Sequence, residues 1–259
     1  MKYNHRSILF TLLLTLITSC QTIPKGVSPV EATWLYGQFA LPETVTITGK
    51  TELFTPSYTD EQWVVSAKKL LKPNIKLPIA IHMHGCGGIG ENDEAYTYRE
   101  ILLSQGYGVF MPDSFQRPGR DRLCGQGGMH ERISLRQSEI QYALKEIRKL
   151  TWVEQDRLVL MGFSEGGNAT DNWYTNDFAG LIILGSACTH SGGSPSAPKE
   201  VPVLAIVGEA DDYRPGMSCT INRSIGGSKS VVISGGDHWI ASYTQTKNSI
   251  LQFLKQCCK

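Results

Sequence analysis

The sequence predicts an α/β fold in which helices cover both faces of a mostly parallel sheet. Short apolar runs rich in β-branched residues alternate along the chain with segments of helical periodicity. Glycine-rich or acidic turns follow several of these runs directly, as expected where parallel strands end. The length of 259 residues suits one such domain with a short N-terminal extension.

Seven segments are predicted as strands and four as helices. The predicted strands are 44–54, 77–82, 107–111, 157–161, 180–184, 201–207 and 229–233. The predicted helices lie near 95–105, 133–150, 165–174 and 239–255. In the segment 133–150, Ile133, Ile140, Leu144 and Ile147 recur near helical spacing, which indicates a stripe facing the core rather than a cofactor site.

The N-terminus has the pattern of an export signal. Lys2 and Arg6 precede an apolar stretch, residues 8–17, that is too short to span a bilayer and has the size of a signal-peptide core. The stretch ends in Leu-Ile-Thr-Ser-Cys20, which resembles the bacterial lipobox and implies cleavage before Cys20 and lipidation of its sulfur. An ordinary secretory signal is the alternative.

These features predict residues 1–19 as a signal peptide, 20–40 as a tether and 41–259 as the folded domain. We expect a monomer in the bacterial cell envelope, held to the membrane through the lipid on Cys20. Gln21, rather than aspartate, after the cysteine favours the outer membrane. The balance of 25 basic and 24 acidic side chains gives no basis for nucleic-acid binding.

The strongest chemical signal is the segment Gly-Phe-Ser164-Glu165-Gly, which follows an apolar run and precedes a predicted helix. In a tight strand-to-helix turn of this pattern, the flanking glycines let the two arms pass closely and the serine hydroxyl projects outward. The alternative is a glycine-rich loop that matches by chance. The strand before it favours Ser164 as a nucleophile.

A base and an acid follow in the order that a serine nucleophile requires. Asp211 and Asp212 come directly after the predicted strand 201–207, and His238 follows the strand 229–233. We prefer Asp211 because it is closer to the strand end, with Asp212 as the rival. Aspartate after a strand can also be a turn or N-cap residue, and His238 can cap the last helix.

A second glycine-rich turn, His84-Gly-Cys86-Gly-Gly, follows the predicted strand 77–82. Acyl transfer requires backbone N–H groups that bind the developing oxyanion. The amides of Cys86 and of Glu165, the residue after the nucleophile, are the predicted donors. A flexible loop or a metal-binding His/Cys pair is the alternative, although the usual Cys-x-x-Cys spacing of structural zinc is missing.

Together these motifs resemble the dienelactone hydrolase family of α/β-hydrolases. The resemblance also includes the segment 112–115, covers residues 77 to the C-terminus, and implies an α/β-hydrolase fold with a triad of Ser164, Asp211 and His238. The namesake enzymes use a cysteine nucleophile where this chain has Ser164, so dienelactone is a doubtful substrate. No metal or organic cofactor is expected.

The expected activity is hydrolysis of small, fairly soluble esters or lactones. The connection 186–199 is a short Ser/Gly/Pro loop with no room for a large cap domain, which argues against long-chain lipids. Within the loop 114–132, Arg117, Arg120 and Arg122 are candidates for binding a substrate carboxylate, or they form a solvated basic loop. Hydrolysis of small amides or peptides, and a non-catalytic ligand-binding lipoprotein, are the alternative functions.

Six cysteines lie beyond Cys20, an even set that fits an oxidising compartment. The expected disulfides are Cys86–Cys124 and Cys188–Cys219, since each would join loops at the carboxyl edge of the sheet. The adjacent Cys257 and Cys258 are expected to stay free or to pair with another molecule, because a vicinal bridge is strained. The alternative is that most of these cysteines are buried free thiols.

Overall fold

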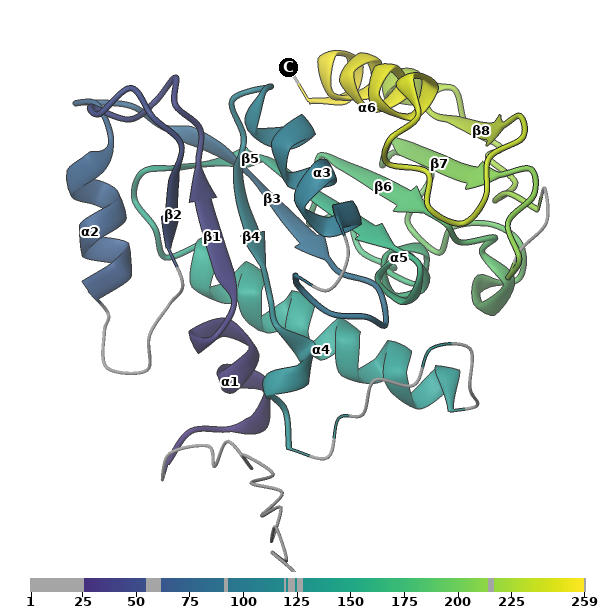
Figure 1. Cartoon of the computed structure of the whole chain (residues 1–259), viewed down its shortest axis with the longest axis horizontal. Helices are drawn as coiled ribbons and strands as arrows, with labels where there is room; N and C mark the ends of the chain where they lie inside the picture. Colours follow the sequence, from purple (N-terminus) through teal and green to yellow (C-terminus); the bar gives the residue numbers. More distant parts are fainter. Residues whose placement is uncertain are drawn as a thin grey trace, which may run out of the picture.

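The computed structural model describes residues 26–54, 62–90, 93–118, 120, 124, 128–213 and 217–258. They form an eight-stranded sheet in the order β2-β1-β4-β3-β5-β6-β7-β8, with helices on both faces (Figure 1). The strands are β1 (Gln38–Leu41), β2 (Glu52–Phe54), β3 (Leu77–Met83), β4 (Gly108–Met111), β5 (Val153–Phe163), β6 (Gly180–Leu184), β7 (Val203–Gly208) and β8 (Lys229–Ile233). The helices are α1 (Pro29–Leu35), α2 (Gln62–Leu70), α3 (Asp93–Leu103), α4 (Met129–Ile147), α5 (Glu165–Asp171) and α6 (Thr244–Cys257), with 3-10 turns η1 (Ser114–Gln116), η2 (Thr189–Ser191) and η3 (Ile225–Gly227).

The sheet is parallel from β4 through β3 to β8, whereas β1 pairs antiparallel with both β2 and β4. The strands β3, β4, β6 and β7 and the second half of β5 are buried on both faces, whereas residues of the edge strand β8 alternate between partly buried and exposed. In β5, Leu158 and Leu160 pack on one side of the sheet and Val159 and Met161 on the other. Such strands appear in the sequence as continuous apolar runs, and the predicted fold class is confirmed.

The two layers of helices enclose two parts of the core. Trp34 of α1, Ile140 of α4 and Ala169 of α5 belong to the cluster on one face of the sheet. Leu102 of α3 and Phe253 of α6 belong to the cluster on the other face. The predicted apolar stripe of α4 therefore faces the core, and α5 lies beneath the end of β5 (Figure 1).

The segment 20–40 was predicted as a tether, but the folded region already begins within it. Ser28 caps α1 in a reciprocal capping box with Glu31, and β1 lies within the sheet between β2 and β4. The predicted signal peptide and Cys20 lie outside the described residues. Within the part of the chain that is described, we find no helix of the length and apolarity needed to cross a bilayer.

Several predicted boundaries differ from the structure. Only residues 52–54 of the predicted strand 44–54 form a strand, and α2 was not predicted. The predicted helix from Trp239 begins at Thr244 instead, because the backbone N–H groups of Trp239 and Ala241 donate to the carboxylates of Asp237 and Glu94 rather than along a helix.

The connection from β6 to β7, residues 185–202, is described throughout and contains only the 3-10 turn η2 as regular structure. It holds no cap domain, in agreement with the prediction. The carboxyl ends of β5, β7 and β8 are therefore not covered by an insertion at this point of the chain.

Candidate active site

Ser164 occupies the turn between β5 and α5 with a strained backbone, at φ 54° and ψ −113°. Positive φ costs a non-glycine residue on the order of 1–3 kcal/mol and is often found at functional sites. Neither flanking glycine has room for a side chain. A Cβ on Gly162 would lie 2.1 Å from the carbonyl oxygen of Gly166, and one on Gly166 would lie 2.1 Å from that of Met83. The glycines therefore allow the turn that projects Ser164.

His238 lies between Ser164 and Asp211. Its Nε2 is 3.0 Å from Oγ of Ser164, and its Nδ1 is 2.7 Å from Oδ2 of Asp211. Asp211 has no exposed surface, and its Oδ1 accepts the backbone N–H of Tyr213 at 2.8 Å. Asp212, the rival acid, is exposed. The structure thus brings together the serine, base and acid that the sequence suggested.

Backbone and side-chain contacts hold the loop of His238 against the end of β7. A Cβ on Gly208 would lie 2.0 Å from the carbonyl oxygen of Asp237, so only glycine permits this approach. The Glu209 carboxylate accepts the backbone N–H of Gly235 and the hydroxyl of Ser234, and these hydrogen bonds lower the pKa of Glu209. From the other side, buried Glu94 of α3 accepts the N–H of Ala241.

Three aromatic rings surround the imidazole of His238. The ring centroids of Tyr213, Phe163 and Trp239 lie 4.7, 5.0 and 5.5 Å from that of His238. Phe163 is buried, whereas Tyr213 is 49% and Trp239 46% exposed. The imidazole therefore has an open aromatic border on which the apolar part of a ligand can pack.

The second predicted oxyanion segment lies beside Ser164. A Cβ on Gly85 would lie 3.5 Å from Cβ of Ser164, and one on Gly166 would lie 2.8 Å from the carbonyl oxygen of His84. The backbone N–H of Gly88 donates to the carbonyl of Gly85 at 3.2 Å and closes the turn. Cys86 and Glu165, whose amides are the predicted donors, thus belong to two adjacent segments.

His84 is fixed as a neutral ring. Its Nδ1 lies 2.6 Å from the carbonyl oxygen of Gly85, and its Nε2 accepts the backbone N–H of Ser114 at 3.1 Å. Burial, together with the positive charge of Arg136, holds the pKa of His84 well below its usual range. A neutral ring with its proton on Nδ1 satisfies both contacts.

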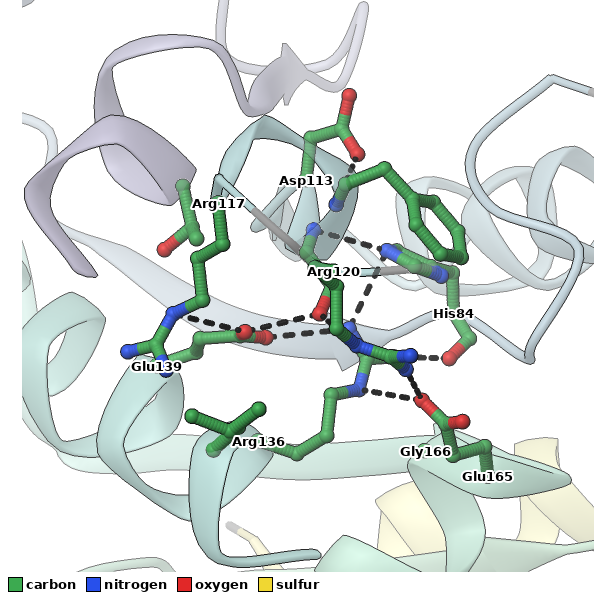
Figure 2. Close-up of polar contacts among 12 residues, drawn as sticks. His84, Asp113, Arg117, Arg120, Arg136, Glu139, Glu165 and Gly166 are labelled. Carbon is green, nitrogen blue, oxygen red and sulfur yellow. Dashed lines mark hydrogen bonds and ion pairs between the residues drawn. The ribbon is translucent and has the colours of Figure 1, made fainter. Parts of the chain in front are cut away.

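Two of the three predicted substrate-binding arginines, Arg117 and Arg120, take part in internal ion pairs. Arg120 pairs with Glu165, and Nε of Arg117 lies 3.5 Å from Oε1 of Glu139 (Figure 2). Arg122 lies outside the described residues. The structure therefore places Arg117 and Arg120 in a protein network rather than on an open binding surface.

The centre of this network was not predicted from the sequence. Arg136 of α4 is fully buried between Glu139 and Glu165, with His84 next to it (Figure 2). Arg132 adds a further pair, its Nε 3.2 Å from Oε2 of Glu165. The positions 132, 136 and 139 are spaced to share one face of a helix, a signal that could have revealed the cluster.

Three disulfides join the six cysteines. Cys86–Cys124 and Cys188–Cys219 are both present, as expected from the sequence. The first connects the turn after β3 to the arginine-containing loop. Contrary to expectation, Cys257 and Cys258 are joined to each other at the end of α6. Because the two cysteines are adjacent in the sequence, this disulfide does not close a long loop.

The third strand-end histidine, His82, is buried and packs edge-on against Tyr98 of α3. Burial lowers the pKa of His82 to about 3, and the charge of Arg136 adds to this shift. Among the described residues, no three His, Cys, Asp or Glu side chains are grouped as a metal site would need.

Comparison of the structure with solved structures identifies its architecture. A cold-adapted esterase from an Arctic intertidal metagenomic library matches with a TM-score of 0.56 and 14% identity over 72% of this chain and 85% of its own. Esterase PE8 matches with a TM-score of 0.52 and 14% identity over 71% of this chain and 94% of its own. Est1E from Butyrivibrio proteoclasticus matches with a TM-score of 0.52 and 16% identity over 71% of this chain and 90% of its own. The chain has the α/β-hydrolase fold.

Neither a protein-family model nor a curated protein matches the sequence. Within the α/β-hydrolase fold, the strand-to-helix turn at the carboxyl edge of the sheet is the position of the nucleophile. Ser164, between β5 and α5, occupies this turn.

Proposed function

We propose that the protein is a serine hydrolase that cleaves small carboxylic esters or lactones through an acyl-enzyme. The observation that carries the proposal is the continuous set of hydrogen bonds from Ser164 through His238 to Asp211. The strained turn at Ser164 and the α/β-hydrolase fold support it. The resemblance of its motifs to those of the dienelactone hydrolase family also supports the proposal.

In this mechanism, Oγ of Ser164 attacks the ester carbonyl carbon while Nε2 of His238 takes the hydroxyl proton. Asp211 accepts the Nδ1 proton of His238 in a hydrogen bond, so it keeps the lone pair of Nε2 directed at the serine and stabilises the imidazolium. The imidazolium then gives its proton to the departing alkoxide. Water, deprotonated by His238, attacks the acyl carbon, the bond to Oγ of Ser164 breaks, and the imidazolium returns its proton to this oxygen as the acid leaves.

The tetrahedral intermediates carry a negative charge on the former carbonyl oxygen. We assign the backbone N–H groups of Cys86 and Glu165 as the donors to this oxygen. Both belong to segments that pack directly against Ser164. Since backbone groups bind the oxyanion, the side chains of Cys86 and Glu165 are available for a disulfide and for ion pairs.

The short β6–β7 connection favours small substrates over long-chain lipids. A small acyl group can reach Ser164 without the opening of a cap, and the exposed rings of Tyr213 and Trp239 offer an apolar contact. We further propose that the enzyme works in the bacterial envelope, anchored through a lipid on Cys20. Replacement of Cys20 by serine would then abolish incorporation of a labelled fatty acid and move the protein out of the membrane fraction.

The test of the activity uses the chain from Gln21 onward and compares it with Ser164→Ala. A fluorophosphonate probe should label the parent protein, which should hydrolyse short-chain p-nitrophenyl esters, and Ser164→Ala should lose both properties. Ser134→Ala, a change at an exposed serine on α4, is the matched control. A folded parent that neither reacts nor turns over would reject the proposal in favour of a ligand-binding lipoprotein. Cleavage of anilides faster than of esters would favour the amide hydrolase.

A further inference from the structure

We infer that Arg136 is a positioning residue that holds the two halves of the oxyanion hole in register. The inference rests on the proposed function, because the two backbone donors have a common task only if Ser164 attacks a carbonyl group. It concerns a side chain that lies too deep to touch a substrate, since Arg136 has no exposed surface.

The two donors come from segments far apart in the sequence. Cys86 follows β3 and Glu165 follows β5, yet both N–H groups must point at one oxygen from hydrogen-bond distance. An error of about 1 Å in such an arrangement can cost roughly 100-fold in rate. A contact that fixes one segment relative to the other therefore matters for catalysis.

Arg136 makes this contact with a single guanidinium group (Figure 2). Its Nη2 donates to the carbonyl oxygen of His84, two residues before Cys86, and its Nε lies 3.6 Å from Oε1 of Glu165. The guanidinium is planar and rigid, so one group bridges the two segments through a hydrogen bond on the β3 side and an ion pair on the α5 side. A lysine ammonium at the same place would have no such fork.

The side chain of His84 strengthens the link on the β3 side. Nη1 of Arg136 lies 3.2 Å from Nε2 of His84, whose Nδ1 in turn contacts the carbonyl of Gly85. The backbone N–H of Ser114 shares Nε2. Arg136 thus fixes the turn before Cys86 through both the main chain and the side chain of His84.

Further ion pairs anchor the guanidinium of Arg136 and the carboxylate of Glu165. Glu139 accepts from Nη1 of Arg136 at 3.1 Å and keeps the guanidinium from turning. Glu165 is also paired with Arg120 and Arg132, which fixes the first residue of α5 from two further sides. These side chains are almost entirely buried, so water does not loosen the pairs.

Stability alone is a poor explanation for the network. Buried ion pairs are often no more stabilising than apolar side chains of similar volume, because desolvation offsets their attraction. A role in aligning the two N–H donors explains why a charged guanidinium is buried there and why it lies between His84 and Glu165. The neighbours Arg117 and Arg120 then serve as supports of this alignment.

The experiment compares Arg136→Lys and Arg136→Met with the parent chain and with Arg148→Met. Arg148 directly follows α4 and forms an exposed ion pair with Asp177, so its replacement is the matched control. For each protein we would measure kcat and KM with p-nitrophenyl butyrate per fluorophosphonate-titrated site, the Ki of an alkyl boronic acid, and the Tm. The boronic acid forms a tetrahedral adduct on serine and reports on the oxyanion hole.

We expect kcat of both Arg136 variants to fall by roughly 10- to 100-fold with KM nearly unchanged. The Ki of the boronic acid should rise in parallel with the loss of kcat/KM, whereas Arg148→Met should match the parent. Wild-type kcat in Arg136→Lys would contradict positioning, because charge alone would suffice. Folded variants with a normal Ki for the boronic acid would overturn the inference.

If neither Arg136 variant folds, Glu165→Gln removes the charge at the other end of the bridge with little change in size. We expect a loss of kcat of about 10-fold with the same parallel rise in Ki, and unchanged values would reject the inference. A parent protein without Ser164-dependent turnover would instead refute the proposed function, and the inference with it. An active parent with unaffected variants refutes the inference alone.

Discussion

Nδ1 of His238 lies 2.7 Å from Oδ2 of Asp211, a carboxylate with no exposed surface. An ionised carboxylate can only accept a hydrogen bond, so it selects the tautomer with a proton on Nδ1. Nε2 then presents its lone pair to Oγ of Ser164, 3.0 Å away. The direction of proton transfer in the proposed mechanism follows from this contact.

Asp211→Asn tests the contact directly. An amide can donate its own N–H to Nδ1 and hold the imidazole in the wrong tautomer, so we expect kcat to fall by roughly 10³- to 10⁴-fold with little loss of Tm. Asp212→Asn alters the exposed neighbour and should change kcat by less than about 2-fold. Steady-state kinetics on the same p-nitrophenyl ester would compare the two. The opposite ranking would assign the triad acid to Asp212.

The buried His82 predicts a pH dependence of stability. Its pKa is about 3 in the folded protein, against an ordinary value of 6.5, because of burial and the charge of Arg136. The unfolded chain therefore binds one more proton between these values, and stability falls as the pH drops below about 6.5, by about 1.4 kcal/mol per pH unit. Above that pH the contribution is fully present.

His82→Phe would remove this term while keeping a ring against Tyr98. We expect the free energy of unfolding to fall by about 2 kcal/mol more in the parent than in the variant between pH 6.5 and 5.0. Urea denaturation at several pH values would measure it. The pKa of His84 is also lowered, mainly by burial and by Arg136, which both proteins share, so most of its contribution cancels in the comparison. Parallel stability curves would show that His82 does not stay neutral in the folded state.

The inner strands of the parallel sheet could be predicted because they are buried on both faces, whereas the edge strand β8 is a short β-branched run with alternating exposure. The predicted segments 180–184 and 229–233 agree with β6 and β8 residue for residue. β5 was predicted too short, since its first half carries the polar residues Glu154, Gln155 and Asp156. β1 has only four residues and no distinctive pattern, whereas the Ser28 and Glu31 capping box before it was a readable signal of α1.

Some residues of the candidate site could likewise be predicted from the sequence, and others could not. Ser164, Asp211 and His238 follow strand ends in local motifs, so their meeting at one sheet edge could be predicted from the order of the elements. Arg136 and Glu94 lie in no local motif, and the helical spacing of positions 132, 136 and 139 is a much weaker signal. Charged residues on helices usually face solvent, and only the packing of α4 and α3 against the strand ends shows that these two are buried.

The two long-range disulfides should differ in their effect on catalysis. They span 38 and 31 residues, so removal of either should destabilise the protein by a similar amount, about 2–4 kcal/mol. Only Cys86 supplies a proposed oxyanion donor. The double variant Cys86→Ala with Cys124→Ala keeps the amide but frees the turn, and we expect kcat to fall by about 10-fold.

The double variant Cys188→Ala with Cys219→Ala is the matched control and should keep kcat near that of the parent. Denaturant titration would give the stabilities, and kinetics would be measured at a temperature at which both variants are folded. A similar kcat in the two variants would mean that Cys86–Cys124 contributes stability alone, and that contacts such as those of Arg136 suffice to hold the turn.

The open aromatic border of His238 predicts a preference for esters with a ring in the alcohol part. His238 protonates the leaving group in the proposed mechanism, and the ring of Trp239, 46% exposed, lies 5.5 Å from the imidazole, so we expect it to contact the leaving group. Trp239→Ala should lower kcat/KM for naphthyl esters by roughly 10-fold, because a stacked ring contact is lost, and for methyl esters by less than about 2-fold. Tyr174→Ala, which alters an exposed ring packed on Trp173 instead, should leave both values unchanged. Equal losses for both ester classes in Trp239→Ala would mean that Trp239 orients His238 rather than contacts the substrate.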